Sequence, residues 1–498
     1  MTTQPEITDL RSALQFLSQI PGQLICTDQE VDPIAELSGV YRYIGAGGTT
    51  MRPTKSGPSM VFNNIKGFPG ARVNIGMLAD RKRVAMLLGT TIDRLGFHMA
   101  DALGHPVDPV FVTKEQAPSQ EIVHLATDPG FDIRKLIPAP TNTPVDAGPF
   151  ITMGLCCASD PETGETDVTI HRLCLQGPDT LSMFISMGRH LGTFRDKYEK
   201  ENKAMPITIN IGLDPAVYIA ACFEAPSTPL GFNELSIAGA LRKKAVELVK
   251  AVSIDGKSLA RAEIVIEGEL LPHERMVEDV NSHTGRAMPE FPGYNGPANP
   301  SLPIVKVKAV TTRVNPIMQT CIGCSEEHVN LAGIPTEASI IQLIGKAIPG
   351  FLKNVYAASC GGGKLMAVLQ VGKRTPADEG RQGQAALLAF SAFCELKNVF
   401  LVDEDVDPFD MDDVLFAMTT RYQGNLDTTF LPNIRSHQLD PSQDPRYNNA
   451  IRARGLACKT IFDCTVPWSI KEEFVRAPFL EVPDYEKYLT PSSKPLEL

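Results

Sequence analysis

Apolar residues recur at helical spacing near the start of the chain and at strand spacing soon after it. In residues 7–20 the apolar side chains lie three or four positions apart and the run stops at Pro21, which predicts a helix. The other elements expected here are strands at 59–62 and 73–77 and a helix at 80–88. Together they predict a first α/β domain over residues 1–115.

Strand patterns dominate the next part of the chain. Four prolines within residues 137–150 predict a loop that leads into it. The expected strands are 168–173, 207–211, 262–269 and 304–314, and helical runs are expected near 178–198 and 237–252. This pattern predicts a sheet-rich central domain over residues 116–320.

Helical and strand patterns alternate in the last part of the chain. Thr336 is expected to cap a helix over residues 338–348, and Pro349 and Gly350 to end it. The other expected elements are strands at 355–358, 365–371 and 399–402 and a helix at 380–396. A third, α/β domain over residues 321–498 follows, so the fold class is α+β. Its polar, proline-containing end, residues 465–498, is expected to wrap a surface or a partner subunit.

Composition and charge narrow the classes of protein. The 498 residues carry a net charge of −11, which argues against a nucleic-acid binder. No apolar run is long enough to span a bilayer, and the first residues lack the pattern of a signal peptide, so a cytoplasmic location is expected. The 11 scattered cysteines suit reduced thiols, and Cys321-x-x-Cys324 has no second pair to complete a zinc site.

Ionisable residues fall on one expected strand of the central domain. Asp167 and His171 point to one side of this strand and Arg172 to the other, and burying them requires partners. Asp167, His190 and Glu247, the last in an expected helical run, make a set of two carboxylates and one imidazole. Such a set suits Mn²⁺ or Mg²⁺. Separate salt bridges are the alternative interpretation, because spacing alone does not bring these residues together.

Motifs along nearly the whole chain resemble those of UbiD-type decarboxylases, the family that uses prenylated FMN. The stretches that carry the resemblance are residues 35–42, 45–49, 139–144, 167–172, 287–294, 326–328 and 403–407. They are most similar to the branch that acts on protocatechuate (3,4-dihydroxybenzoate) and gallate. The resemblance implies that the central domain is the flavin-binding split β-barrel of this family.

The resemblance also implies the cofactors and the residues that hold them. Prenylated FMN, supplied by a separate flavin prenyltransferase, is expected together with K⁺ and a divalent cation, Mn²⁺ or Mg²⁺. The cation would bridge the cofactor phosphate to Asp167, His190 and Glu247. The expected cofactor-binding residues are Asp167, Val168, Thr169, Ile170, His171, Arg172, Arg189, His190 and Glu247.

Catalytic roles follow from the same motifs. Glu290 is bracketed by Met288 and Phe291, and desolvation there would raise the carboxyl pKa toward a range in which it can donate a proton. The resemblance places the family's proton donor at Glu290 and its active-site arginine at Arg172. Many family members have a second glutamate five positions before the donor, where this chain has Gly285.

Two histidines are expected to compensate for that departure. His328 and His437 lie in loop-like stretches, where a histidine is usually a surface residue, but both match histidines that line the substrate site in the similar branch. One is expected to replace the missing glutamate and the other to hold a ring hydroxyl. Lys364, which follows a glycine run, is either part of a plain loop or lies near a substrate carboxylate or hydroxyl.

The resulting hypothesis is a reversible, non-oxidative decarboxylase of a phenolic acid. Protocatechuate is the expected substrate, with gallate, 4-hydroxybenzoate and vanillate as alternatives. A dimer or trimer of dimers is the oligomer that the resemblance implies. From other classes of protein, a metal-dependent hydrolase and a non-catalytic flavin-binding subunit stay open.

Overall fold

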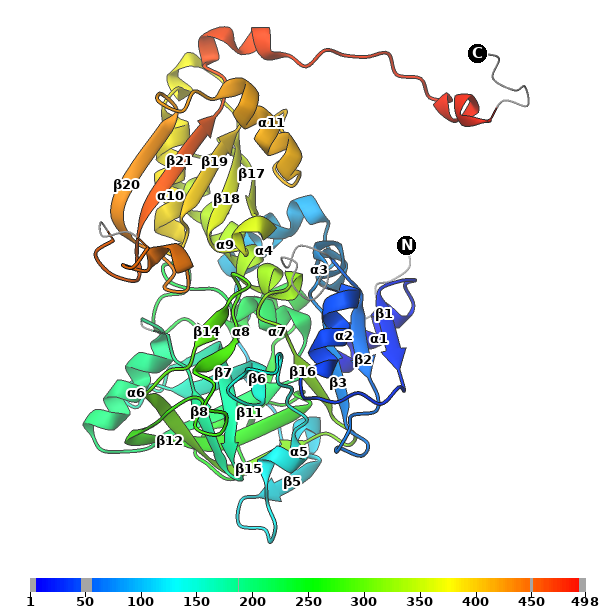
Figure 1. Ribbon diagram of the computed structural model, residues 1–498, viewed down its shortest axis with the longest axis vertical. Helices are drawn as coiled ribbons and strands as arrows, with labels where there is room; N and C mark the ends of the chain where they lie inside the picture. The colour runs from blue at the N-terminus through cyan, green and yellow to red at the C-terminus, as the bar shows by residue number, and fades with distance from the viewer. Residues whose placement is uncertain (1–5, 46–55, 187, 448–450, 492–498) are drawn as a thin grey trace.

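The computed structural model describes residues 6–45, 56–186, 188–447 and 451–491, and it has three parts (Figure 1). A small blue N-terminal domain lies beside a green and cyan barrel, and a yellow and orange sheet domain stands above both. Most of the glycine-rich stretch 45–49 lies outside the described residues. The predicted α+β class, with a central barrel, is confirmed.

The N-terminal part is a four-stranded sheet with helices packed on it. Its strands, in the order β1-β2-β3-β16, are β1 (Leu24–Thr27), β2 (Ser59–Phe62), β3 (Arg72–Ile75) and β16 (Ile317–Thr320). Its helices are α1 (Leu10–Ser18), α2 (Glu36–Gly45), α3 (Arg81–Leu88) and α4 (Leu95–Gly104). Because β16 pairs in parallel with β3, the chain returns to this sheet after completing the barrel.

A closed barrel of six antiparallel strands forms the central part. In order around the barrel they are β12 (Ile264–Met276), β9 (Met205–Ile211), β6 (Phe150–Ser159), β7 (Thr166–Gly177), β8 (Thr180–Met183) and β15 (Leu302–Thr312), which pairs back to β12. Alternate apolar side chains such as Leu173, Ile207 and Val305 are buried in its core. Closure leaves no free edge between these six strands.

Shorter elements decorate the barrel. They are β4 (Val110–Phe111), β5 (Ile122–Leu125), α5 (Ile133–Leu136), α6 (His190–Lys200), α7 (Pro215–Ala220), α8 (Leu235–Arg242), β10 (Glu247–Lys250), β11 (Lys257–Leu259), β13 (Arg286–Pro289) and β14 (Asn295–Pro297). The helix expected around residues 178–198 is wrong in its first half. There the chain forms the hairpin strand β8, because Leu181 and Met183 are buried against β7 and β15.

The C-terminal part is a five-stranded sheet with helices on its faces. Its order is β17 (Leu352–Ala357), β18 (Met366–Val371), β19 (Asn398–Val402), β21 (Leu456–Cys464) and β20 (Thr428–Arg435). The helices are α9 (Glu326–Ala347), α10 (Arg381–Ala392) and α11 (Met411–Arg421). Residues 475–491 run away from the body as a mostly extended segment, with one short 3-10 helix at Tyr485–Leu489 (Figure 1).

Helix α9 differs most from the sequence-based expectation. It begins at Glu326 rather than after Thr336 and carries Pro335 within it. Thr336 does not cap the helix, because its hydroxyl donates to the carbonyl of Ala332 one turn earlier, at 2.8 Å. Packing against α4, α7, α10 and β17 on most sides holds the helix together in spite of the proline.

Candidate active site

A cavity of about 220 Å³ lies between the barrel and the C-terminal domain. Side chains from β7, from the segment after β13, from the start of α9 and from the loops of the C-terminal sheet line it. All the residues predicted to be catalytic meet there: Arg172, Glu290, His328, Lys364 and His437. Residues more than two hundred positions apart therefore share one enclosed space.

Arg172, on β7, sits between two carboxylates. Its guanidinium donates two hydrogen bonds, both 3.0 Å long, to the carboxylate oxygens of Glu278, and another to Glu290. Glu278 is buried just after β12 and also accepts from the backbone N–H of Asn299 at 3.0 Å. The fork of an arginine matches a carboxylate in this paired geometry.

Glu278 corrects the expectation built on Gly285. Gly285 lies in a turn with φ of +70°, and no side chain is needed there, because a second carboxylate already reaches Arg172 from twelve residues before Glu290. A histidine is therefore not required to replace the missing glutamate. Sequence reasoning missed Glu278 because it considered only the position five before the donor.

The environment of Glu290 favours its protonated form. Burial raises the pKa of this carboxyl, Arg172 opposes the shift, and the negative charge of Glu278 adds to it. The backbone is held closely here, since a Cβ at Gly323 would lie 2.1 Å from the carbonyl oxygen of Pro289. That contact requires glycine and fixes the strand end that carries Glu290.

Phe291 connects Glu290 to the two histidines. Its ring lies edge-on to His437 with centroids 4.7 Å apart and is tilted to His328 at 5.9 Å. Burial, together with the nearby Lys364, lowers the pKa of His328 to about 3 and that of His437 to about 4. Both imidazoles are therefore neutral at neutral pH, and His328 belongs to the first turn of α9 rather than to a loop.

Four charged side chains form a connected group in the cavity lining. Lys364 Nζ lies 2.9 Å from Glu395 Oε2 and 3.9 Å from Glu224 Oε1, and Glu224 accepts from Arg189 at 2.5 Å. Burial alone would lower the pKa of Lys364, but Glu395 and Glu224 outweigh it and raise the pKa. Sequence reasoning missed both glutamates. Glu395 could have been noticed as a lone charge between apolar Phe393 and Leu396.

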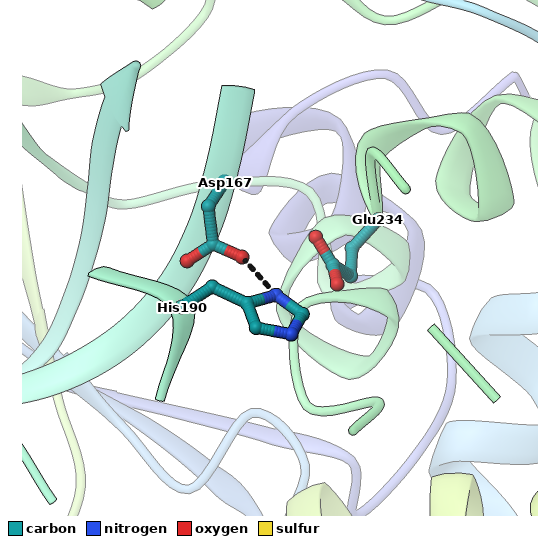
Figure 2. Close-up of side chains that lie close together, drawn as sticks. All are labelled: Asp167, His190 and Glu234. Carbon is teal, nitrogen blue, oxygen red and sulfur yellow. Dashed lines mark hydrogen bonds and ion pairs between the residues drawn. The ribbon is translucent and has the colours of Figure 1, made fainter. Parts of the chain in front are cut away.

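Beside the cavity, three ligand-type side chains converge. Asp167 on β7, His190 at the start of α6 and Glu234 at the start of α8 have ligand atoms within 4.8 Å of one another and point toward each other (Figure 2). His190 Nδ1 lies 3.1 Å from Asp167 Oδ1. Among the described residues, Glu234 Oε2 is buried without a hydrogen-bond partner. Two carboxylates and an imidazole fit Mn²⁺ or Mg²⁺.

Glu247 is not part of this cluster, so the prediction of Glu247 as the third metal ligand is wrong; Glu234 lies in that place. The expected helical run breaks after α8 at Lys243, which has φ of +53°, and Glu247 begins strand β10 instead. There it binds Arg261 at 2.7 Å and lines a separate cavity. Leu248 pairs with β11 and β4, and this pairing makes the segment a strand. The helical spacing alone gave no sign of these long-range partners. Glu234 directly precedes an apolar run, a position typical of a helix start.

The strand residues expected to bind a cofactor fall on both sides of β7. Thr169, Ile170, His171, Arg172 and Arg189 line the cavity, whereas Asp167 and Val168 lie outside its lining, Asp167 within the ligand cluster. Within the described part of the chain, His171 Nε2 is buried with no hydrogen-bond partner. Burial, and then Arg189, lowers the pKa of His171 to about 3, so this nitrogen is available to a polar group in the cavity.

Other candidate sites in the sequence carry no such geometry. The cysteines form no disulfide in the described part of the chain, and Cys321 donates to the carbonyl of Ile322. No described helix is both long and apolar enough to cross a membrane.

Family models match most of the chain. They are described as the N-terminal domain of 3-octaprenyl-4-hydroxybenzoate carboxy-lyase, at residues 17–103, its Rift-related domain, at 110–326, and its C-terminal domain, at 329–464, all under the name UbiD. The domain boundaries at 115 and 320 remain a prediction.

Individual relatives are similar over nearly their whole length. A gallate decarboxylase of Lactiplantibacillus plantarum is 55% identical over 98% of this chain and 100% of its own. The apo structure of a 3,4-dihydroxybenzoic acid decarboxylase from Enterobacter cloacae is 61% identical, with a TM-score of 0.92 over 97% of this chain and 99% of its own. An evolved dimeric UbiD-class enzyme from Pelotomaculum thermopropionicum, in complex with prFMN, is 32% identical, with a TM-score of 0.81 over 96% and 98%.

Proposed function

The chain belongs to the UbiD family of decarboxylases, and we propose that it releases CO₂ from a phenolic acid, with protocatechuate as the substrate. The observation that carries the proposal is the arrangement of the cavity. A buried acid, Glu290, and Arg172 line it together with Lys364 and two neutral histidines. Arg172 and Glu290 suit a carboxylate that is lost and replaced by a proton, and Lys364 and the histidines suit ring hydroxyls. Gallate is the nearest alternative.

Prenylated FMN is the cofactor that fits the proposal, because relatives bind FMN and prFMN. Thr169, Ile170, His171, Arg172 and Arg189 would hold it, and Asp167, His190 and Glu234 would hold Mn²⁺ or Mg²⁺. K⁺ is part of the same proposal. When bound, this group accepts electron density as CO₂ leaves. The orphan Nε2 of His171 and the orphan Oε2 of Glu234 are the observations that support the fit.

Arg172 orients the acid, and Glu290 returns the proton. The guanidinium, already oriented by Glu278, offers donors to the substrate carboxylate. Glu290, whose carboxyl pKa is raised by burial, donates its proton to the carbon that has lost CO₂. Phe291 packs on His328 and His437 and excludes water from the ring.

The extended C-terminal segment is proposed to bind a second copy of this chain. Its apolar side chains include Phe479, which is 93% exposed, and Leu480, which is 88% exposed. A segment that leaves the body and exposes large apolar residues gains stability by packing on a partner (Figure 1). Removing residues 475–498 should lower the oligomer mass measured by light scattering, and an unchanged mass would contradict this role. Asp484→Asn, which changes an exposed polar residue of the same segment, is the control.

The decarboxylase proposal is tested by a screen of phenolic acids. Protein co-produced with a flavin prenyltransferase, the expected cofactor supplier, is incubated with protocatechuate, gallate, 4-hydroxybenzoate and vanillate while headspace CO₂ is measured. CO₂ release with catechol formation supports the proposal. Hydrolysis of an ester by flavin-free, metal-loaded protein would favour a hydrolase. Flavin bound without consumption of any acid would favour a non-catalytic subunit.

A further inference from the structure

Glu395 lines the cavity next to Lys364 and His437. Its Oε2 lies 2.9 Å from Lys364 Nζ and 3.5 Å from His437 Nε2, and its side chain is only 17% exposed. It follows α10 in the loop that leads to β19, so the C-terminal domain brings it to the barrel. No role in the proposed reaction has yet been assigned to it.

The hydrogen bonds of His437 fix which of its nitrogens carries the proton. The backbone N–H of Leu439 donates to His437 Nδ1 at 3.1 Å, so Nδ1 is an acceptor. A neutral imidazole with an unprotonated Nδ1 carries its proton on Nε2, the nitrogen that faces Glu395. His437 therefore presents a donor to the cavity.

Lys364 is also purely a donor, because an ammonium has no acceptor. A ring hydroxyl that enters between Lys364 and His437 can accept from both, but its own proton then needs an acceptor. Glu224, the other nearby carboxylate, is engaged by Arg189 at 2.5 Å. Burial would raise the pKa of Glu395, but the charges of Lys364 and Arg189 outweigh it and lower the pKa, so Glu395 is ionised and can accept.

On the basis of the proposed decarboxylase function, we propose that Glu395 accepts the hydrogen bond of the substrate hydroxyl para to the carboxylate. Lys364 and His437 donate to the same oxygen. A methyl ether at this position can still accept from them but cannot donate to Glu395, and it leaves the carboxylate facing a methyl group. Glu395 thus selects acids with a free para hydroxyl.

A substitution that preserves shape isolates this contact. Glu395→Gln keeps the size of the side chain, so steric exclusion of a methoxy group is unchanged. The amide is a weaker, neutral acceptor, and its NH₂ can donate to a methoxy oxygen. Losing a hydrogen bond to a charged group typically changes selectivity by about tenfold or more.

The test compares two substrates in the holoenzyme. The ratio of kcat/KM for protocatechuate to that for 3-hydroxy-4-methoxybenzoate is expected to be at least about tenfold in the wild type. It should fall at least about fivefold in Glu395→Gln. Glu379→Gln is the matched control, because Glu379 also binds a lysine, Lys373 at 2.7 Å, but does not line the cavity. An unchanged ratio in folded Glu395→Gln would overturn the proposal.

Binding of the products gives a second measurement that needs no turnover. Calorimetry with catechol and 2-methoxyphenol should show the same loss of preference in the variant. If Glu395→Gln does not stay folded, Glu395→Asp keeps the charge but withdraws it by one methylene, and its ratio must also fall. A wild type that consumes no phenolic acid contradicts the decarboxylase function, whereas turnover with an unaltered ratio in the variants contradicts only the role of Glu395.

Discussion

At the scale of single residues, the site depends on one arginine shared by two buried carboxyls. Glu278 accepts from Nε and Nη2 of Arg172, whereas Glu290 accepts from Nη1. The negative charge of Glu278 also disfavours ionisation of Glu290 and so helps to raise the pKa of Glu290. Glu278 therefore acts on catalysis through its neighbours, as a positioning residue.

Glu278→Gln should move the pH dependence of turnover. Glu290 must be protonated to donate, so activity is lost as pH rises through its pKa. Without the negative charge at Glu278 that pKa falls, and the alkaline limb of the kcat profile should shift to lower pH. Glu269→Gln, on β12 and paired with Lys308 at 2.9 Å, is the control and should keep the wild-type profile. A profile that does not move in Glu278→Gln would show that Glu278 has no electrostatic effect on the acid.

At the scale of elements, helix α9 joins the N-terminal domain to the active site. Glu327, fully buried in its first turn, accepts from the backbone N–H groups of Gly76 and Leu78 at 2.8 and 3.0 Å. One position later, His328 faces the cavity. A second buried residue, Glu337, accepts from Nη1 and Nη2 of Arg81. The helix is thus anchored to the loop after β3 at the point where it delivers His328.

Glu327→Leu should destabilise the protein strongly. It leaves two buried N–H groups without an acceptor, at a cost of about 1–3 kcal/mol each. Glu327→Gln keeps one acceptor oxygen and should cost roughly half as much. Glu404→Leu removes an exposed partner of Lys353 and should change stability by less than about 1 kcal/mol. Thermal unfolding measures all three, and equal stability of Glu327→Leu and the wild type would contradict the anchoring role.

Local patterns in the sequence were sufficient for elements that are also stabilised locally. Strand β2 has the predicted bounds, and Asp80 caps α3 at the start of the predicted helix. Local patterns were not sufficient where packing against distant parts of the chain determines the secondary structure. Pro335 would normally interrupt a helix, yet α9 continues through it because neighbours surround it. Residues 247–250 fall within the expected helical run near 237–252, yet they form β10 because two strands pair with it.

The same distinction applies to the site. Glu290 could be recognised from its apolar neighbours and from the family motif. Glu278, Glu395 and Glu234 could not, because their roles arise only when the barrel closes and the C-terminal domain docks on it. The predicted ligand Glu247 lies away from Asp167 and Glu234 lies beside it, because spacing along the chain carries no information about which carboxylate reaches Asp167.

At the scale of the whole molecule, the groups proposed to hold the metal ion and those proposed to bind the ring hydroxyls come from different parts of the chain. Asp167, His190 and Glu234 belong to the barrel and its surrounding helices (Figure 2). Lys364, Glu395 and His437 belong to the C-terminal sheet domain. The cavity exists only where these two parts meet.

Glu234→Gln should lose the bound divalent cation and retain little flavin, because it removes one of three converging ligands. Glu247→Gln is the matched control and should keep both, since Glu247 binds Arg261 away from the cluster. Metal content by mass spectrometry and flavin absorbance of the purified proteins provide the measurements. Full metal and flavin in Glu234→Gln, or their loss in Glu247→Gln, would contradict the assignment of Glu234.

Protonation by Glu290 of the carbon from which CO₂ departs can be followed in D₂O. Protocatechuate is turned over there by the wild type and by Glu290→Gln, which keeps the size of the side chain but removes the transferable proton. The wild type should yield catechol with one deuterium at that carbon. The variant should retain flavin and metal, yet release CO₂ at least about 10²-fold more slowly. A folded, flavin-loaded Glu290→Gln protein that works at the wild-type rate would contradict the account.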